Sequence, residues 1–170
     1  MNPLSQKTFV LLWFHPLFRN NLNHYYSTFQ SINMYPIDLV AHMSQELVEA
    51  GFESLETPAE VDAVLDNQKG TVLLVVNSVC GCAARNARPA AISAIHNDKK
   101  PMKLATVFAG VDQAATAKAR EYLFPYPPSS PSMGLFKDGK LVHFIERHHI
   151  EGRPAELIAA NLKMAFDAYC

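Results

Sequence analysis

A short apolar run, Thr71 to Val76, constrains the fold more than any other stretch of the chain. It is followed at once by Asn77-Ser78-Val79-Cys80-Gly81-Cys82 and then by an alanine-rich segment, 83–95. An apolar run without alternation is typical of a central strand that is buried on both faces. We therefore predict a buried strand, a sharp turn and a helix, with two thiols where the helix begins.

Periodicity and turn signals place the other elements of an α/β domain. Apolar residues at helical spacing predict helices near 36–50, 58–69, 113–123 and 154–169. The second of these opens with a capping box, Thr57-Pro58-Ala59-Glu60. Extended segments are predicted at 52–55, 104–109, 133–137 and 141–145, the last two joined by a hairpin turn at Asp138-Gly139. This order predicts three layers, α/β/α, around a mixed central sheet.

Four finer expectations follow from single residues. Pro89 removes a backbone donor and should kink the helix after the cysteines. Asp112 is placed to cap the helix that follows it. His148 and His149 suggest a metal site, but we expect them to end a strand instead, where adjacent side chains point in different directions and one imidazole is solvated. The last helix should bury one stripe of its surface, formed by Ile158, Leu162, Ala165, Phe166 and Tyr169.

Residues 1–33 differ from the rest of the chain. Their apolar stretch, Phe9 to Phe14, is short, only Lys7 precedes it as a basic residue, and no small-residue cleavage motif follows. These features do not predict a signal peptide. We interpret 1–33 as an N-terminal extension, disordered or upstream of a working start at Met34, and 34–170 as the folded domain.

The composition limits the classes of partner. A net charge of −1 gives no electrostatic footprint for nucleic acid, and no run of about 18 apolar residues predicts a membrane span. Three cysteines are too few for a disulfide framework. A Cys-x-Cys pair in such a chain indicates redox or metal chemistry in a reducing compartment.

The position of the two thiols predicts thiol–disulfide exchange. A thiolate at a helix start is stabilised by unpaired N–H groups and the helix dipole, so its pKa should fall. Cys80, nearer the turn, should be the more exposed and should attack. Cys82, in the first turn, should be less accessible and resolve, if it acts at all. Closing a disulfide around Gly81 alone is tight, which favours exchange and isomerisation over strong reduction.

Other interpretations of these residues stay open. Asn77, Ser78 and Arg85 are candidates to stabilise the thiolate, or they form a polar turn and a solvated arginine. Cys80 and Cys82 could instead bind zinc or copper(I), although a structural zinc site needs four ligands. A redox-inert interaction protein is a further alternative. Cys170 is expected to be a terminal thiol without a role in the site.

Three stretches resemble the bacilliredoxin family, whose fold is thioredoxin-like. The first is 77–84, which holds the Cys-Gly-Cys motif, with its continuation at 86–89. The others are the loop Pro128-Ser129-Ser130-Pro131-Ser132-Met133 and the segment Glu146-Arg147-His148-His149-Ile150-Glu151-Gly152-Arg153. The resemblance covers about 34–170. It implies that Pro131 is the cis-proline that faces the active cysteine and that, with Gly81, it shapes the site.

The resemblance also implies an activity. It is the removal of bacillithiol from S-bacillithiolated proteins in the cytoplasm, with Cys80 as the thiol that becomes S-bacillithiolated and no bound cofactor or metal. Bacillithiol would be the co-substrate, and a low-molecular-weight thiol would complete the cycle. Weak protein disulfide isomerase activity is the alternative that the same chemistry allows.

Overall fold

The computed structural model describes residues 35–66 and 69–170, so the predicted extension 1–33 and the start at Met34 lie outside the described residues. The described elements alternate between helix and strand up to a C-terminal hairpin and helix. In chain order they are α2 (Ile37–Glu49), β1 (Glu53–Ser54), α3 (Pro58–Leu65), β2 (Thr71–Asn77), the π-helical turn η2 (Ala83–Ala87), α4 (Arg88–Ala94), β3 (Lys103–Phe108), α5 (Gln113–Tyr122), β4 (Ser132–Lys137), β5 (Lys140–Ile145), α6 (Arg147–Ile150) and α7 (Ala155–Tyr169).

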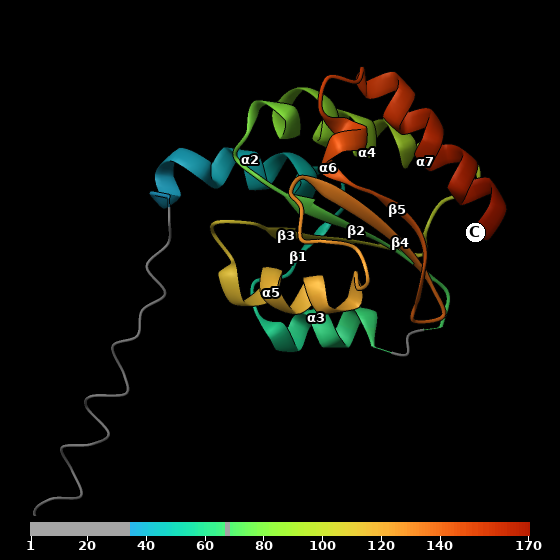
Figure 1. Ribbon diagram of the computed structural model, residues 1–170, viewed down its shortest axis with the longest axis horizontal. Helices are drawn as coiled ribbons and strands as arrows, with labels where there is room; N and C mark the ends of the chain where they lie inside the picture. Colours follow the sequence, from blue (N-terminus) through green and yellow to red (C-terminus); the bar gives the residue numbers. More distant parts are fainter. Residues whose placement is uncertain (1–34, 67–68) are drawn as a thin grey trace, which may run out of the picture. The chain divides into compact units, whose positions relative to one another are not determined.

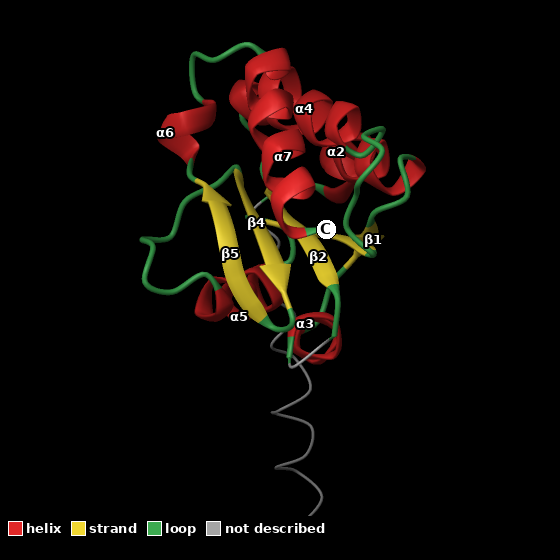
Figure 2. Cartoon of the chain, turned by 90° about the vertical axis from the view of Figure 1, so that its right-hand side faces the viewer, coloured by secondary structure: helices red, strands yellow, loops and turns green. Residues whose placement is uncertain are grey.

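The five strands form one mixed sheet in the order β1-β3-β2-β4-β5. β3 pairs in parallel with both β1 and β2, whereas β4 pairs antiparallel with β2 and with β5. Helices α2, α4 and α7 cover one face, and α3 and α5 cover the other (Figures 1 and 2). The predicted three-layer α/β/α architecture with a mixed sheet is confirmed.

Strand β2 supplies side chains to both halves of the core, as its unbroken apolar run predicts. Leu73 and Val75 belong to the cluster beneath α2, α4 and α7. Val72, Leu74 and Val76 belong to the cluster beneath α3 and α5. Every residue of β2 is buried, so the strand is a fixed base for the residues at its carboxyl end.

The local signals at the capping box and the hairpin are confirmed. Thr57 Oγ1 accepts the Glu60 N–H at 3.3 Å, and the Glu60 carboxylate accepts the Thr57 N–H at 2.9 Å. Asp138 and Gly139 have φ angles of 50° and 74°, the left-handed region that a tight hairpin turn requires. Asp138 also accepts the Gly70 N–H at 2.8 Å, which ties the hairpin to the start of β2.

Pro89 is accommodated by a π-helical turn. Gly81 and Cys82 are already helical, and the five residues of η2 then widen the helix before α4 begins. Within this turn the Arg88 N–H donates to the Ala83 carbonyl, five residues back. The wider turn relieves the clash that the Pro89 ring would make with the carbonyl four residues before it.

Two expectations about single side chains are wrong. Asp112 stands at the N-cap position of α5, but its carboxylate makes no cap and instead accepts the Phe108 N–H at 3.3 Å. Burial raises the pKa of Asp112, against the lowering effect of that hydrogen bond. Tyr169 is 36% exposed and lies outside the buried stripe of α7, which gains Ala159 in its place.

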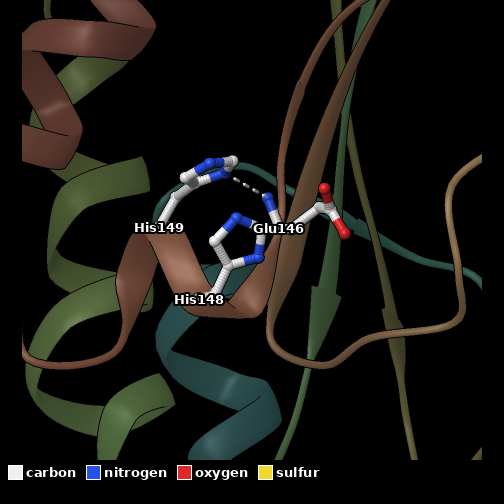
Figure 3. Close-up of side chains that lie close together, drawn as sticks. All are labelled: Glu146, His148 and His149. Atoms are coloured by element: carbon white, nitrogen blue, oxygen red, sulfur yellow. Dashed lines mark hydrogen bonds between the residues drawn. The ribbon is translucent and has the colours of Figure 1, made fainter.

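The histidine pair does not end a strand. His148 and His149 lie in α6, and their rings are 3.8 Å apart (Figure 3). The Glu146 N–H donates to His149 Nδ1 at 3.3 Å. Because the segment turns helical after Glu146, the alternation of side chains that a strand would impose does not apply.

Candidate active site

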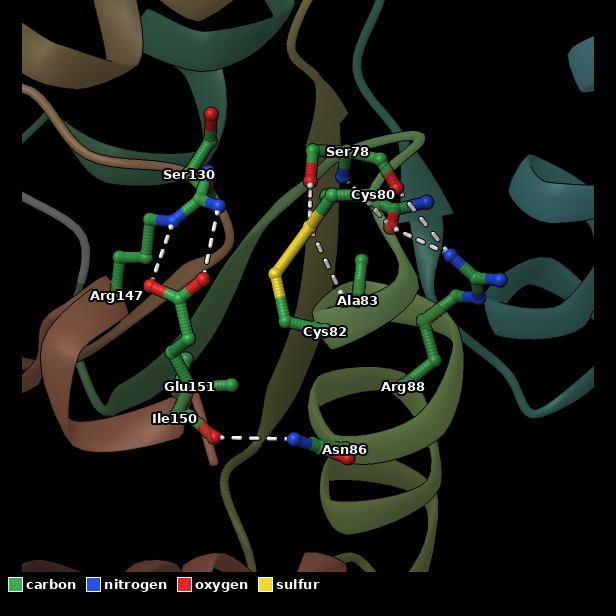
Figure 4. The surroundings of a disulfide bond; sticks show 11 residues. Ser78, Cys80, Cys82, Ala83, Asn86, Arg88, Ser130, Arg147, Ile150 and Glu151 are labelled. Atoms are coloured by element: carbon green, nitrogen blue, oxygen red, sulfur yellow. Dashed lines mark hydrogen bonds and ion pairs between the residues drawn. A yellow bond between two sulfur atoms is a disulfide. The ribbon is translucent and has the colours of Figure 1, made fainter. Parts of the chain in front are cut away.

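Cys80 is the last residue before the helix, at the point where the prediction placed it. β2 ends at Asn77, and the Cys80 carbonyl accepts the N–H groups of Ala83 and Ala84 at 3.0 and 3.2 Å. Cys82 lies within the first helical turn. The chain therefore presents both sulfurs at the carboxyl end of the central strand (Figure 4).

The two thiols are joined in a disulfide, and their Cα atoms lie 5.4 Å apart. Both residues are half-buried, and the greater exposure expected for Cys80 stays a prediction. In this state neither sulfur is a thiolate that could bind a metal. Cys170 is free and exposed, as expected for a terminal thiol.

Hydrogen bonding distinguishes the two sulfurs. Cys80 Sγ accepts the Ser78 hydroxyl at 3.2 Å and the Ala83 N–H at 3.3 Å (Figure 4). In residues 35–66 and 69–170, no donor makes a hydrogen bond to Cys82 Sγ. Donors that point at a sulfur favour its negatively charged form. The arrangement is suited to stabilise charge on Cys80 after reduction.

A buried arginine, which the sequence analysis did not single out, holds the turn before Cys80. Arg88 is 2% exposed, and its Nε lies 2.6 Å from the Glu46 carboxylate of α2. Its Nη1 donates to Asn77 Oδ1 and to the Ser78 carbonyl, both at 3.3 Å. Asn77 in turn accepts the Ser78 N–H at 2.9 Å and donates to the Met43 carbonyl at 3.0 Å.

The three polar residues that were candidates to stabilise the thiolate lie at different distances from Cys80 Sγ. Ser78 contacts the sulfur of Cys80, whereas Asn77 positions Ser78 through its side-chain amide. Arg85 is exposed and lies above Gly81, with its guanidinium 3.8 Å from where a Cβ of residue 81 would stand. Arg88 lies at helical spacing from Ala91 and Ile95, a signal that would have placed it on the buried face.

Pro131 lies buried at the start of β4, and the Ser130–Pro131 peptide bond is cis, as the resemblance implied. A second cis bond, Phe124–Pro125, was not predicted.

Ser130 and Cys80 line one cleft of about 500 Å³. The other residues that line it are Tyr35, Ser78, Val79, Ala109, Gly110, Gln113, Thr116, Arg120 and Arg147.

A separate group of potential metal ligands lies at α6. One ligand atom each from Glu146, His148 and His149 lie within 4.8 Å of one another. Both imidazoles are exposed, and His149 Nδ1 already accepts a backbone N–H. Three ligands fall one short of a closed structural zinc site, and Cys80 and Cys82 are not among them.

Replacing Ser78 by alanine should weaken the nucleophile without unfolding the domain. Loss of one hydrogen bond to the sulfur should slow alkylation of Cys80 at pH 7 roughly fivefold and move the pH midpoint of alkylation upward. The measurement is the iodoacetamide rate against pH in a Cys82→Ser background. Ser93→Ala, an exposed serine on α4, is the matched control and should leave both quantities unchanged. An unaltered pH midpoint in Ser78→Ala would contradict the assignment.

Solved structures place the fold in a known class. The chain is similar to a candidate oxidoreductase with a thioredoxin fold, with a TM-score of 0.54 and 15% identity over 68% of this chain and 96% of that one. It is also similar to a thioredoxin of Malassezia sympodialis, with a TM-score of 0.50 and 14% identity over 70% and 90%. These likenesses show the fold. Among the described helices, none is long and apolar enough to cross a membrane. The fold and the paired thiols, together with the proteins that match this chain in sequence, define a thiol–disulfide oxidoreductase.

Sequence comparison then gives the family. A family model described as "Disulphide isomerase" matches residues 35–170. A bacilliredoxin of Cytophaga hutchinsonii is 58% identical over 134 residues, 79% of this chain and 98% of that protein. A bacilliredoxin of Halalkalibacterium halodurans is 53% identical over 136 residues, 80% of this chain and 94% of that protein. The chain belongs to the bacilliredoxin family, which confirms the resemblance and sets aside a redox-inert role.

Proposed function

We propose that this oxidoreductase removes bacillithiol from S-bacillithiolated proteins in the cytoplasm, with Cys80 as the attacking thiol. The observation that carries the assignment of Cys80 is the pair of donors on its sulfur, Ser78 Oγ and the Ala83 N–H. The names of the relatives support bacillithiol as the thiol that is removed. Gly81 and Pro131 shape the site, and no metal takes part.

The reaction is two successive exchanges. The Cys80 thiolate attacks the bacillithiol sulfur of the mixed disulfide, a new S–S bond forms as the old one breaks, and the target protein leaves as a thiolate that takes a proton from water. A second thiolate then attacks the adduct on Cys80. If Cys82 attacks, bacillithiol leaves and the Cys80–Cys82 disulfide forms; if a low-molecular-weight thiol attacks, Cys80 is released directly.

The test uses one target protein that carries a single mixed disulfide. Reduced chain should strip bacillithiol from this target and act more slowly on the same cysteine carrying glutathione, as mass spectrometry of both proteins would record. Disulfide isomerisation is the second candidate, which the description of the matching family model favours. A bacillithiolated target that stays intact, beside a scrambled disulfide substrate that is rearranged, would favour isomerisation and overturn the proposal.

A further inference from the structure

Two arginines line the cleft beside Cys80, Arg120 of α5 and Arg147 of α6. None of the described residues that line it is an aspartate or glutamate. Its volume of about 500 Å³ lies in the range of sites that bind small molecules. Cys80 is itself one of the lining residues, so a group bonded to its sulfur lies beside this space.

Two polar groups of α5 in this cleft lack partners. Thr116 is 2% exposed, and its Oγ1 makes no hydrogen bond. Arg120 Nε is also buried without a hydrogen-bond partner, and its guanidinium forms no ion pair within the described part of the chain. Buried donors in folded proteins are nearly always satisfied, so each exception needs an explanation. Of the three such atoms among the described residues, those of Thr116 and Arg120 line the same cleft as the candidate nucleophile, and the third, Ser129 Oγ, does not.

Arg147 has a different role, although it lines the same cleft. Its Nε and Nη2 bind the Glu151 carboxylate at 3.4 and 3.3 Å, and its Nη1 donates to the Ser130 carbonyl at 3.1 Å (Figure 4). These contacts use three of its five N–H groups, pair its charge with Glu151 and fix the wall next to Pro131. Arg120 is therefore the cation of the cleft that is available to a ligand.

We propose that this cleft is a binding subsite for a carboxylate group on the small thiol that becomes bonded to Cys80. Arg120 binds the carboxylate with its planar fork of N–H groups, and the Thr116 hydroxyl donates a further hydrogen bond. The proposal rests on the proposed function, because it requires that Cys80 forms the mixed disulfide. It adds the chemical class of thiol that the site prefers.

The test compares small symmetrical disulfides that differ in charge. In a Cys82→Ser background, Cys80–S⁻ reacts with R–S–S–R to give Cys80–S–S–R and R–S⁻, and the reaction stops there. The probes are dithiodiglycolate, which is anionic, hydroxyethyl disulfide, which is neutral, and cystamine, which is cationic. Each rate is divided by the rate of free mercaptoethanol with the same probe. We expect the normalised rate to favour the anionic over the neutral probe by about tenfold or more.

Variants of Arg120 and Thr116 test whether these two residues cause the preference for the anionic probe. Arg120→Gln should reduce the preference for the anionic over the neutral probe to within about threefold, and Arg120→Lys should retain part of it. Thr116→Val should lower the preference yet leave the thermal midpoint unchanged or higher, because it removes a buried hydroxyl that has no partner. Arg153→Gln, an exposed arginine outside this cleft, is the matched control for the loss of one charge.

Each outcome decides a specific point. Equal normalised rates for the three probes, or an anionic preference that survives in Arg120→Gln, would overturn the subsite while Cys80 remains the nucleophile. Failure of the neutral probe to react at all would overturn the proposed function, and the subsite with it. A last comparison uses two mixed disulfides between a small thiol and a peptide, one with the carboxylate on the small thiol and one with it on the peptide. A faster reaction of the probe whose peptide carries the carboxylate would mean that the cleft recognises the target protein instead.

Discussion

Replacing Cys80 by serine should abolish attack on a bacillithiol mixed disulfide, whereas Cys82→Ser should keep the attack and accumulate the adduct on Cys80. The reason is that only a thiolate attacks the disulfide sulfur, and the donors Ser78 Oγ and Ala83 N–H serve the sulfur of Cys80. Intact-protein mass spectrometry after mixing each reduced variant with a bacillithiolated target measures both results. Added small thiol should clear the adduct from Cys82→Ser and restore turnover.

Cys170→Ser is the matched control, because Cys170 is a free and exposed thiol at the end of the chain. It should behave as the unaltered chain does. An inactive Cys82→Ser beside an active Cys80→Ser would reverse the assignment of the two thiols. Full activity in both variants would mean that exchange does not take place at the Cys-Gly-Cys motif.

Replacing Arg88 by methionine should lower the free energy of unfolding by about 3 kcal/mol, the lower end of the range for breaking a buried ion pair. The lower end applies because Glu46, the partner of Arg88, is 42% exposed and can be solvated. Asn77 Oδ1 and the Ser78 carbonyl would also each lose a charged donor. Urea unfolding of the reduced protein measures this change.

Arg85→Gln is the control for Arg88→Met, since Arg85 is an exposed arginine of the same helical segment. It should change the free energy of unfolding by no more than about 0.5 kcal/mol. Arg88→Lys should fall between the two, because an ammonium cannot bind Glu46 and the Asn77–Ser78 turn at the same time. Equal unfolding midpoints for Arg88→Met and Arg85→Gln would contradict the structural role of Arg88.

The features that the sequence predicted correctly are those encoded by neighbouring residues. β2 is recognisable because its apolar run is continuous, and Thr57 and Glu60 form their capping box across three residues. Asp138 and Gly139 supply the left-handed conformations of the hairpin within the turn itself. The position of the two thiols at the helix start follows from the order of strand and helix, although their separate roles remain predictions.

The features that sequence reasoning missed depend on contacts between distant parts of the chain. Arg88 is satisfied by Glu46, 42 residues away, and a pattern on one helix does not reveal that partner. The unsatisfied groups of Thr116 and Arg120 become meaningful only when α5 is packed beside the cysteine turn.

The order in which the cysteines are modified tests the central proposal most directly. Unaltered reduced chain is mixed with a bacillithiolated target, quenched in acid within the first turnover, and fragmented so that Cys80 and Cys82 are separated on either side of Gly81. We predict that bacillithiol is found on Cys80 before the Cys80–Cys82 disulfide forms. An adduct that appears first on Cys82 or on Cys170 would contradict this account.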